Sequence, residues 1–213
     1  MVILAAGLGS RLAAESEGRP KQLLDVGGRT LLERQLEIAA LAGCRPLVVS
    51  RPRFAEDFRR TGVEVLVEEA PAGILGTLYH ARAAVQGPFC WIAGDMLFTD
   101  PGPLAEMTAE HLEEGGEASF FFCRSGRFKA KLQPGNPPAV FATREEGHPL
   151  SIPNFWLHSP RVFSYLAPEP DDALYMLRLI AAGEPIRFHE YTAPVFEIDT
   201  PEDLAAARRF FVG

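Results

Sequence analysis

The chain has 213 residues, of which 47% are hydrophobic and 23% charged, and its formal net charge is -7. This composition is that of an ordinary globular protein and excludes the disordered and fibrous classes. An acidic chain is repelled by nucleic acid and by membrane surfaces, so we expect neither as a partner. The three cysteines lie far apart with no CxxC pair, which excludes a disulfide framework and a zinc site and fits a reducing cytoplasm.

The first half of the chain alternates short apolar runs with helix-like segments, as βαβ units of a parallel sheet covered on both faces do. We predict strands at residues 2–5, 47–50, 63–67, 89–93 and 118–123, and helices at 73–84 and 104–114. A further helix follows the first strand, where Thr30 and Glu33 form a capping box and Gly43 ends the helical stripe. No stretch reaches the roughly 20 apolar residues that span a bilayer.

From about residue 124 the pattern changes to turn-rich sequence, which predicts a small antiparallel excursion over about 124–158. Strand-like pieces lie near 127–132, 140–143 and 154–158, and two helices follow at 160–166 and 173–182. We expect a last strand pair at 186–191 and 195–198 and a closing helix that starts at Thr200-Pro201. No linker interrupts the chain, so residues 1–213 are predicted to form a single domain.

The segment behind the first strand is rich in glycine and carries two cations. Gly7 and Gly9 fall at the carboxyl end of the predicted strand, the edge of an open α/β sheet where ligands bind. Glycine there lets backbone amides approach phosphate oxygens, and Arg11 and Lys21 add the positive charge that a polyphosphate needs. The spacing is that of neither a P-loop nor a complete dinucleotide fingerprint, because Leu12 stands in place of a third glycine. The alternative is a glycine turn followed by two solvated cations.

The strings "LAAGLGSRL" and "PKQLLDVGGRTLLERQLE", with nine residues between Arg11 and Lys21, resemble the signature of the sugar-phosphate nucleotidyltransferase family. The resemblance implies a Rossmann-like, mostly parallel mixed sheet and transfer of a nucleoside monophosphate from a nucleoside triphosphate to a sugar-1-phosphate, with release of pyrophosphate. It assigns Arg11 and Lys21 to catalysis. Nucleotide-binding positions are implied at Ala5, Ala6, Gly7, Gly9, Ser10, Arg11, Lys21, Gly73, Gly76 and Asp95. Molybdopterin cytidylyltransferases share "PKQLL" with a shorter gap, so the chain is more similar to the sugar, choline-phosphate or inositol-phosphate branches.

Two acids far apart in the sequence follow predicted strands. Asp95 in "AGDM" and Asp199 in "EIDTPED" stand where the resembled family has metal ligands. Mg²⁺ is typically held by one or two carboxylates together with phosphate oxygens and waters, so we expect Mg²⁺ as cofactor. The alternatives are a turn aspartate for Asp95 and a helix cap for Asp199, although Thr200 and Asp203 already complete that cap.

The acceptor half of the site is less defined. "PAGILGTLYHA" resembles the family's base-recognition segment and supplies Gly73 and Gly76, while Lys129 or Lys131 and Asn154 are candidates for contacts with the acceptor. The alternatives are a glycine-opened helix packed on a sheet and a solvated strand face for the lysines. We expect Trp156 to be a residue of the hydrophobic core rather than a stacking surface for a ligand.

The predicted reaction is in-line attack by an acceptor phosphate oxygen on the α-phosphorus, which needs positioning and charge neutralisation but no covalent nucleophile. Within the enzyme interpretation the rival is a cytidylyltransferase for choline-phosphate, inositol-phosphate or a similar alcohol phosphate. An alternative of another class is a non-catalytic nucleotide or sugar-nucleotide sensor on the same fold. The base, the acceptor and the oligomeric state stay open.

Overall fold

The structure is a computed structural model that describes residues 1–125, 127–128, 130–133, 135, 139–142, 149–166 and 172–212. The chain divides into two compact units, which are described separately. The first unit comprises Met1–Pro71, Ile92–Ala105 and Ala193–Gly213, and the second comprises Ala72–Trp91 and Glu106–Thr192. That residues 1–213 act as a single domain stays a prediction.

The first unit contains parallel strands that the sequence places almost to the residue. They are β1 (Val2–Ala5), β2 (Leu47–Ser50), β3 (Glu64–Val67) and the end of β4 (Phe89–Ala93), in the order β4-β1-β2-β3. Val2 lies opposite Leu47 in β2, and Leu47 opposite Glu64 in β3, so the carboxyl ends of these strands meet at one edge. Ligands of open parallel sheets bind outside this edge.

A short antiparallel pair in the first unit was not predicted as such. Strand β5 (Met96–Phe98) pairs with β11 (Val195–Glu197), and Phe196 lies opposite Leu97. The sequence predicted that the last two strands would pair with each other, and this is wrong: β10 (Ile186–Glu190) pairs with a different strand, β6 (Ala118–Phe122), in the second unit. Each of the two strands pairs instead with a strand far away in the sequence.

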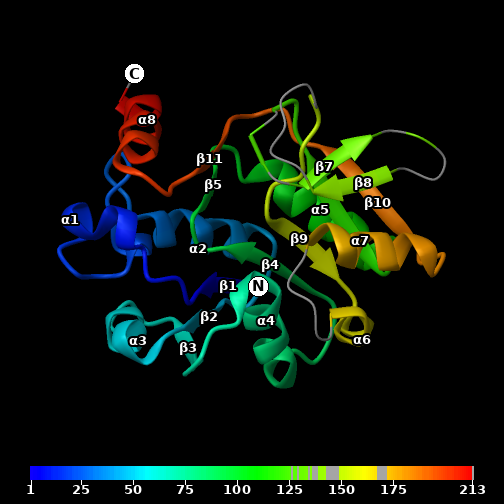
Figure 1. Ribbon diagram of the computed structural model, residues 1–213, viewed down its shortest axis with the longest axis horizontal. Helices are drawn as coiled ribbons and strands as arrows, with labels where there is room; N and C mark the ends of the chain where they lie inside the picture. The colour runs from blue at the N-terminus through cyan, green and yellow to red at the C-terminus, as the bar shows by residue number, and fades with distance from the viewer. Residues whose placement is uncertain are drawn as a thin grey trace. The chain divides into compact units, whose positions relative to one another are not determined.

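The first unit also contains helices that connect or follow its strands (Figure 1). They are η1 (Ser10–Leu12), α1 (Ala13–Ser16), η2 (Lys21–Leu23), α2 (Leu31–Leu41), α3 (Pro52–Arg59), α8 (Pro201–Val212) and the start of α5 (Gly102–Glu114). The predicted capping box of α2 is confirmed, because the Thr30 hydroxyl accepts from the Glu33 amide and the Glu33 carboxylate accepts from the Thr30 amide. Helix α3 was not predicted.

A hydrophobic cluster joins the loop behind β1 to α2 and α8. Its buried members come from both ends of the chain and from β5: Leu12, Leu24, Val26, Leu31, Leu97, Ile198, Leu204 and Ala207, with Phe196 and Phe211 packed against them. Burial of such side chains stabilises by about 1.5 to 3 kcal/mol each. The cluster therefore fixes the segment that carries Lys21 against the segment that carries Asp199.

Gly27, in the turn at 25–30, lies directly against α8. This close approach leads to a prediction about stability. Its φ is 68°, and a Cβ there would collide with Phe211 Cβ. Replacing Gly27 with Ala should lower the free energy of unfolding by more than about 1 to 2 kcal/mol, the cost of a left-handed conformation alone. Gly28→Ala is the matched control, because its φ is 82° but nothing lies within 4 Å of its Cβ position. Equal destabilisation of the two variants in urea unfolding would contradict the packing of α8 on this turn.

The second unit holds the rest of the strands. β6 (Ala118–Phe122) lies between parallel β10 and antiparallel β9 (Phe155–His158), and β9 lies beside the first residues of β4. Strands β7 (Ala130–Gln133) and β8 (Ala139–Ala142) form a separate antiparallel pair. This pair lies within the predicted excursion at 124–158.

Helices of the second unit are α4 (Gly73–His80), η3 (Ala81–Ala84), η4 (Pro160–Val162), α6 (Phe163–Leu166), α7 (Asp172–Ala181) and the main part of α5. Its core is aromatic: Trp156 is fully buried, and its ring meets those of Trp91 and Phe120 edge-on at 4.5 and 5.1 Å between centroids. The interpretation of Trp156 as a core residue is confirmed.

The predicted fold class is confirmed: the protein is α/β, with a mostly parallel mixed sheet, helices and small antiparallel pairs. None of the helices in the described ranges combines the length and apolar character that crossing a membrane requires.

Candidate active site

The glycine loop connects β1 to η1 at the carboxyl edge of the first unit. Gly9 has a φ of 62°, a left-handed conformation that glycine adopts without strain, and its carbonyl accepts from the Leu12 amide at 2.9 Å. Within the described part of the chain, no atom outside Gly7 and its two neighbours lies within 4 Å of the place where a Cβ on Gly7 would stand. The loop therefore presents bare backbone beside an open space, as predicted for a segment whose amides approach phosphate.

The start of this loop is fixed by an arginine that the sequence analysis did not single out. Arg51, directly after β2, donates from Nε to the carbonyl oxygen of Ala6 at 2.5 Å. A peptide is planar and trans, so the Ala6 oxygen and the Gly7 N–H point in opposite directions. By holding the oxygen, Arg51 fixes the direction of the Gly7 N–H. The sequence did contain a signal for Arg51, since it is a cationic residue that directly follows a predicted strand.

Lys21 brings the two predicted acids together. It opens η2, its side chain is 9% exposed, and its Nζ donates to Asp95 Oδ2 at 3.0 Å and to Asp199 Oδ1 at 2.8 Å. A third donation reaches the carbonyl oxygen of Ile198 at 3.0 Å. Residues that are 74 and 178 positions away from Lys21 in the sequence thus converge on one ammonium group.

Asp95 reaches this place through the turn between β4 and β5. The amide of Gly94 donates to the Leu4 carbonyl of β1 at 2.9 Å, and a Cβ on Gly94 would stand 2.8 Å from that oxygen and 2.6 Å from Gln22 Nε2. Only glycine permits this close approach of the backbone, so Gly94 determines where the following residue, Asp95, lies. The Ile198 amide donates to the Asp95 carbonyl at 2.8 Å and fixes the two acidic segments to each other.

Asp199 is not the residue that caps α8. The Thr200 hydroxyl accepts from the Asp203 amide at 3.2 Å, and the Asp203 carboxylate accepts from the Thr200 amide at 3.0 Å. The carboxylate of Asp199 instead binds cations, with Oδ1 on Lys21 and Oδ2 on the Arg11 guanidinium, each at 3.0 Å or less. The prediction that Asp199 is surplus to capping is confirmed.

The two cations differ in their surroundings. Burial lowers the pKa of Lys21, but the charges of Asp95 and Asp199 and their hydrogen bonds outweigh burial, so the net shift of the Lys21 pKa is upward. Lys21 is therefore charged at neutral pH. Arg11 is 66% exposed and touches only the outer oxygen of Asp199. It is free to turn toward a ligand at small cost, because exposed ion pairs contribute about 0 to 1 kcal/mol.

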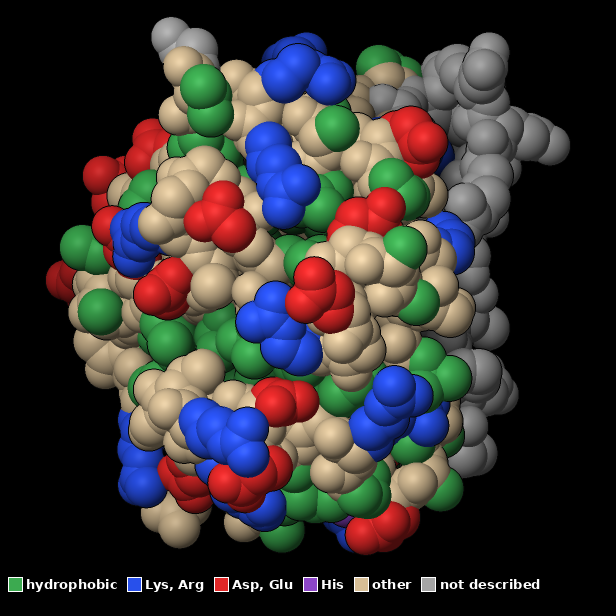
Figure 2. All heavy atoms as spheres, turned by 90° about the vertical axis from the view of Figure 1, so that its left-hand side faces the viewer, with side chains coloured by type: hydrophobic (Ala, Val, Ile, Leu, Met, Phe, Trp, Pro, Cys, Tyr) green, Lys and Arg blue, Asp and Glu red, His purple; other side chains and the backbone are tan. Residues whose placement is uncertain are grey.

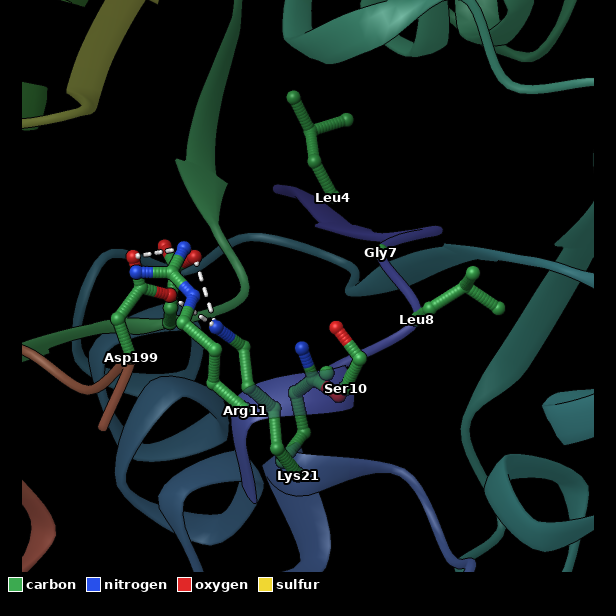
Figure 3. A pocket seen from close by; sticks show the side chains of 10 residues that line it. Leu4, Gly7, Leu8, Ser10, Arg11, Lys21 and Asp199 are labelled. Carbon is green, nitrogen blue, oxygen red and sulfur yellow. Dashed lines mark hydrogen bonds and ion pairs between the residues drawn. The ribbon is translucent and has the colours of Figure 1, made fainter. Parts of the chain in front are cut away.

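These groups line a pocket of about 330 Å³ in the first unit (Figure 3). Its walls are Leu4, Gly7, Leu8, Gly9, Ser10, Arg11, Lys21, Gln22, Asp95 and Asp199. Figure 3 shows the cationic ends of Arg11 and Lys21 turned toward Asp199, with the glycine loop along the other side. The structure thus brings together most of the predicted nucleotide and metal positions of this unit.

Some positions differ from the prediction. Ala5 and Ala6 are buried below the loop and do not line the pocket. Leu4, Leu8 and Gln22 line it but were not named as site residues from the sequence. Gln22 directly follows Lys21 in "PKQLL", and that adjacency was the signal available for it.

The other predicted site residues belong to the second unit. Gly73 opens α4 with a φ of 86°, Gly76 lies within α4, and Asn154 is half-buried before β9. Lys131 is 1% exposed, so the solvated-face alternative is wrong for it; its Nζ donates to the Phe128 carbonyl at 2.5 Å, and burial lowers its pKa. Lys129 lies outside the described residues. Roles of these residues in nucleotide or acceptor binding stay predictions.

The donor set at the pocket suits a hard divalent cation. Within the described ranges, no group of three or more His, Cys, Asp and Glu side chains could hold a metal ion. Two carboxylates, Asp95 and Asp199, do converge, and Mg²⁺ commonly takes one or two carboxylates and completes its shell with phosphate oxygens and water. The residues therefore fit Mg²⁺ that arrives together with a phosphate ligand.

The chain is similar in sequence to known nucleotide transferases. A protein-family model described as "MobA-like NTP transferase domain" matches residues 1–186. The chain is 30% identical over 128 residues to the catalytic subunit beta of mannose-1-phosphate guanylyltransferase from Drosophila melanogaster, covering 54% of the chain and 35% of the relative. It is 28% identical over 130 residues to a glucose-1-phosphate thymidylyltransferase from Xanthomonas campestris pv. campestris, covering 56% and 44%. The matches thus span less than half the length of these relatives.

Among solved structures, the inositol-1-phosphate CTP transferase from T. maritima superposes with a TM-score of 0.80 over 99% of this chain and 94% of that one. The sequence identity is 17%, so this likeness concerns the fold. It agrees with the architecture of the sheet described above.

Proposed function

Because the chain belongs to the MobA-like NTP transferase domain family, we propose that it transfers a nucleoside monophosphate from a nucleoside triphosphate to a sugar-1-phosphate. An oxygen of the acceptor phosphate attacks the α-phosphorus, the bond from the α-phosphorus to the bridging oxygen breaks, and pyrophosphate leaves. The observation that carries the proposal is the convergence of Lys21, Asp95 and Asp199 beside the glycine loop. The names of the two relatives supply the substrate class.

The residues of the pocket have distinct roles in this reaction. The amides of the loop from Gly7 to Arg11 bind phosphate oxygens, and Arg11 swings from Asp199 onto the outer phosphates. Lys21 neutralises charge that develops at the α-phosphate. The acceptor phosphate is already an anion at neutral pH, so no general base is needed. Asp95 and Asp199 hold Mg²⁺, which supplies further charge neutralisation when bound.

The proposal includes the cell compartment and the kind of partner. The three cysteines form no disulfides, which supports a reducing cytoplasm. On the face drawn in Figure 2, Lys and Arg side chains are interspersed with Asp and Glu. A net charge of -7 disfavours nucleic acid, and a small anionic substrate is held by local cations such as Arg11 and Lys21.

The test is an assay of pyrophosphate release with each of the four ribonucleoside triphosphates and dTTP, Mg²⁺ and a panel of phosphomonoesters. The panel contains sugar-1-phosphates, inositol-1-phosphate and choline-phosphate. We expect release with a sugar-1-phosphate. Release with CTP and an alcohol phosphate alone would favour the cytidylyltransferase alternative. Thermal stabilisation by a triphosphate with no pyrophosphate from any pair would reject the transferase and favour a sensor.

A further inference from the structure

All three N–H donors of the Lys21 ammonium have acceptors within the pocket. An ammonium carries three N–H donors and no acceptor. The structure gives it three acceptors within 3.0 Å: Asp95 Oδ2, Asp199 Oδ1 and the carbonyl oxygen of Ile198. No donor of Lys21 is left for a phosphate in this arrangement.

Both carboxylates are bound by cations of the pocket. Asp199 binds Lys21 through Oδ1 and Arg11 through Oδ2, and Asp95 binds Lys21 through Oδ2. The two positive and two negative charges among the lining residues therefore sum to zero. A divalent cation that approached these oxygens would meet an ammonium between them, and like charges at such separations repel strongly in a partly buried site.

We propose that Lys21 is the internal counter-ion of the Asp95 and Asp199 pair, and that a divalent cation binds these carboxylates only after a triphosphate has drawn the Lys21 ammonium away. The inference rests on the proposed function in that the displacing ligand is a triphosphate. Phosphate oxygens are strong acceptors for ammonium and guanidinium groups. Lys21 and Arg11 then exchange carboxylate for phosphate, and the vacated carboxylate oxygens become metal ligands. The metal site is thus assembled by the substrate.

The first experiment measures Mn²⁺ binding by electron paramagnetic resonance, with Mn²⁺ alone as the probe and no nucleotide present. The parent protein should bind Mn²⁺ weakly, and Lys21→Met should bind it at least about 10-fold more tightly, because the ammonium no longer competes for the carboxylates. Arg11→Met is the matched control: it removes the same charge from the same pocket but leaves Lys21 between the acids, so its gain should be much smaller. Lys21→Met combined with Asp95→Asn should lose the gain.

The second experiment uses inorganic triphosphate with a chelator and no metal. It should raise the melting temperature of the parent protein and stabilise Lys21→Met less, because the lysine binds the phosphate before any metal. Melting curves without ligand verify that each variant is folded.

The proposal is overturned if Lys21→Met binds Mn²⁺ no more tightly than the parent, if Arg11→Met gains as much, or if the triphosphate needs a metal to stabilise the parent protein. None of these measurements requires turnover. Absence of pyrophosphate release with the Mn²⁺ pattern intact would therefore remove the transferase proposal and leave the counter-ion role of Lys21 standing.

Discussion

Replacing Asp95 with Asn, or Lys21 with Ala, should lower the rate of pyrophosphate release by about 10²- to 10³-fold, the usual cost of removing one preorganised charge from a transition state. Asp95 accepts from Lys21 at 3.0 Å and stands where a divalent cation would bind. Its amide replacement keeps the shape but not the charge, so both charge neutralisation and metal affinity fall. Steady-state kinetics with the best substrate pair from the panel measure the effect.

Two controls separate this effect from loss of structure. Arg29→Ala removes an exposed cation that pairs with Glu37 at 2.6 Å on α2, outside the pocket, and should leave the rate unchanged. Removing one partner of a buried ion pair destabilises the fold, so melting temperatures accompany each rate. A folded Asp95→Asn or Lys21→Ala variant with a rate near that of the parent would reject the assignment of the site.

Most of the regular elements were predictable because they have a local pattern. Strands β1, β2 and β4 are short apolar runs followed by turn residues or proline, and the capping box of α2 lies within four residues. Strand β5 has no such pattern. Its three residues follow Gly94 and Asp95 directly, and only pairing with β11, about one hundred positions later, makes them a strand. Pairing at this distance is set by tertiary structure.

Helix α3 shows a different limitation, because its signals were present in the sequence. Pro52 stands at its first turn, and Phe54, Ala55 and Phe58 form its buried face. These are a proline in the position that helices tolerate and apolar residues three to four apart. The helix is short, and its many charged residues give it the appearance of a connecting loop.

For the site, the sequence predicted which side chains meet but not how they pair. Lys21, Asp95 and Asp199 stand out because each follows or opens an element at the ligand edge of the sheet. Their mutual neutralisation could not be predicted, since a motif describes the state with bound nucleotide. The contact from Arg51 to the Ala6 carbonyl was hidden for another reason: it depends on the register of β1 and β2, in which Ala5 lies opposite Ser50.

The second large effect concerns His158 and acid stability. The side chain is fully buried at the end of β9, with the rings of Phe120 and Trp156 at 5.7 and 6.1 Å. Burial, with a smaller contribution from the charge of His111, lowers its pKa from 6.5 to about 3. His158 is therefore neutral in the folded protein over most of the acid range.

The sign of the pH dependence follows from this shift. Between about pH 6.5 and 3 the unfolded chain binds a proton at His158 that the folded protein does not bind, so acid favours unfolding. The contribution of His158 is fully present above its unfolded pKa and is lost as the pH falls, at about 1.4 kcal/mol for each pH unit. The free energy of unfolding should thus be about 3 kcal/mol lower at pH 4.5 than at pH 7 through this residue alone.

The measurement is urea unfolding of the parent protein and of His158→Gln at pH 7, 5.5 and 4.5. The variant will be less stable at pH 7, because a buried aromatic contact is lost. Its decline toward pH 4.5 should nevertheless be smaller than that of the parent by about 3 kcal/mol, since glutamine binds no proton in either state. Burial raises the pKa of Glu117, so proton uptake by Glu117 favours the folded state as the pH falls. This contribution is present in both proteins and cancels in the comparison. Parallel declines of parent and variant would show that His158 is not the buried neutral histidine described here.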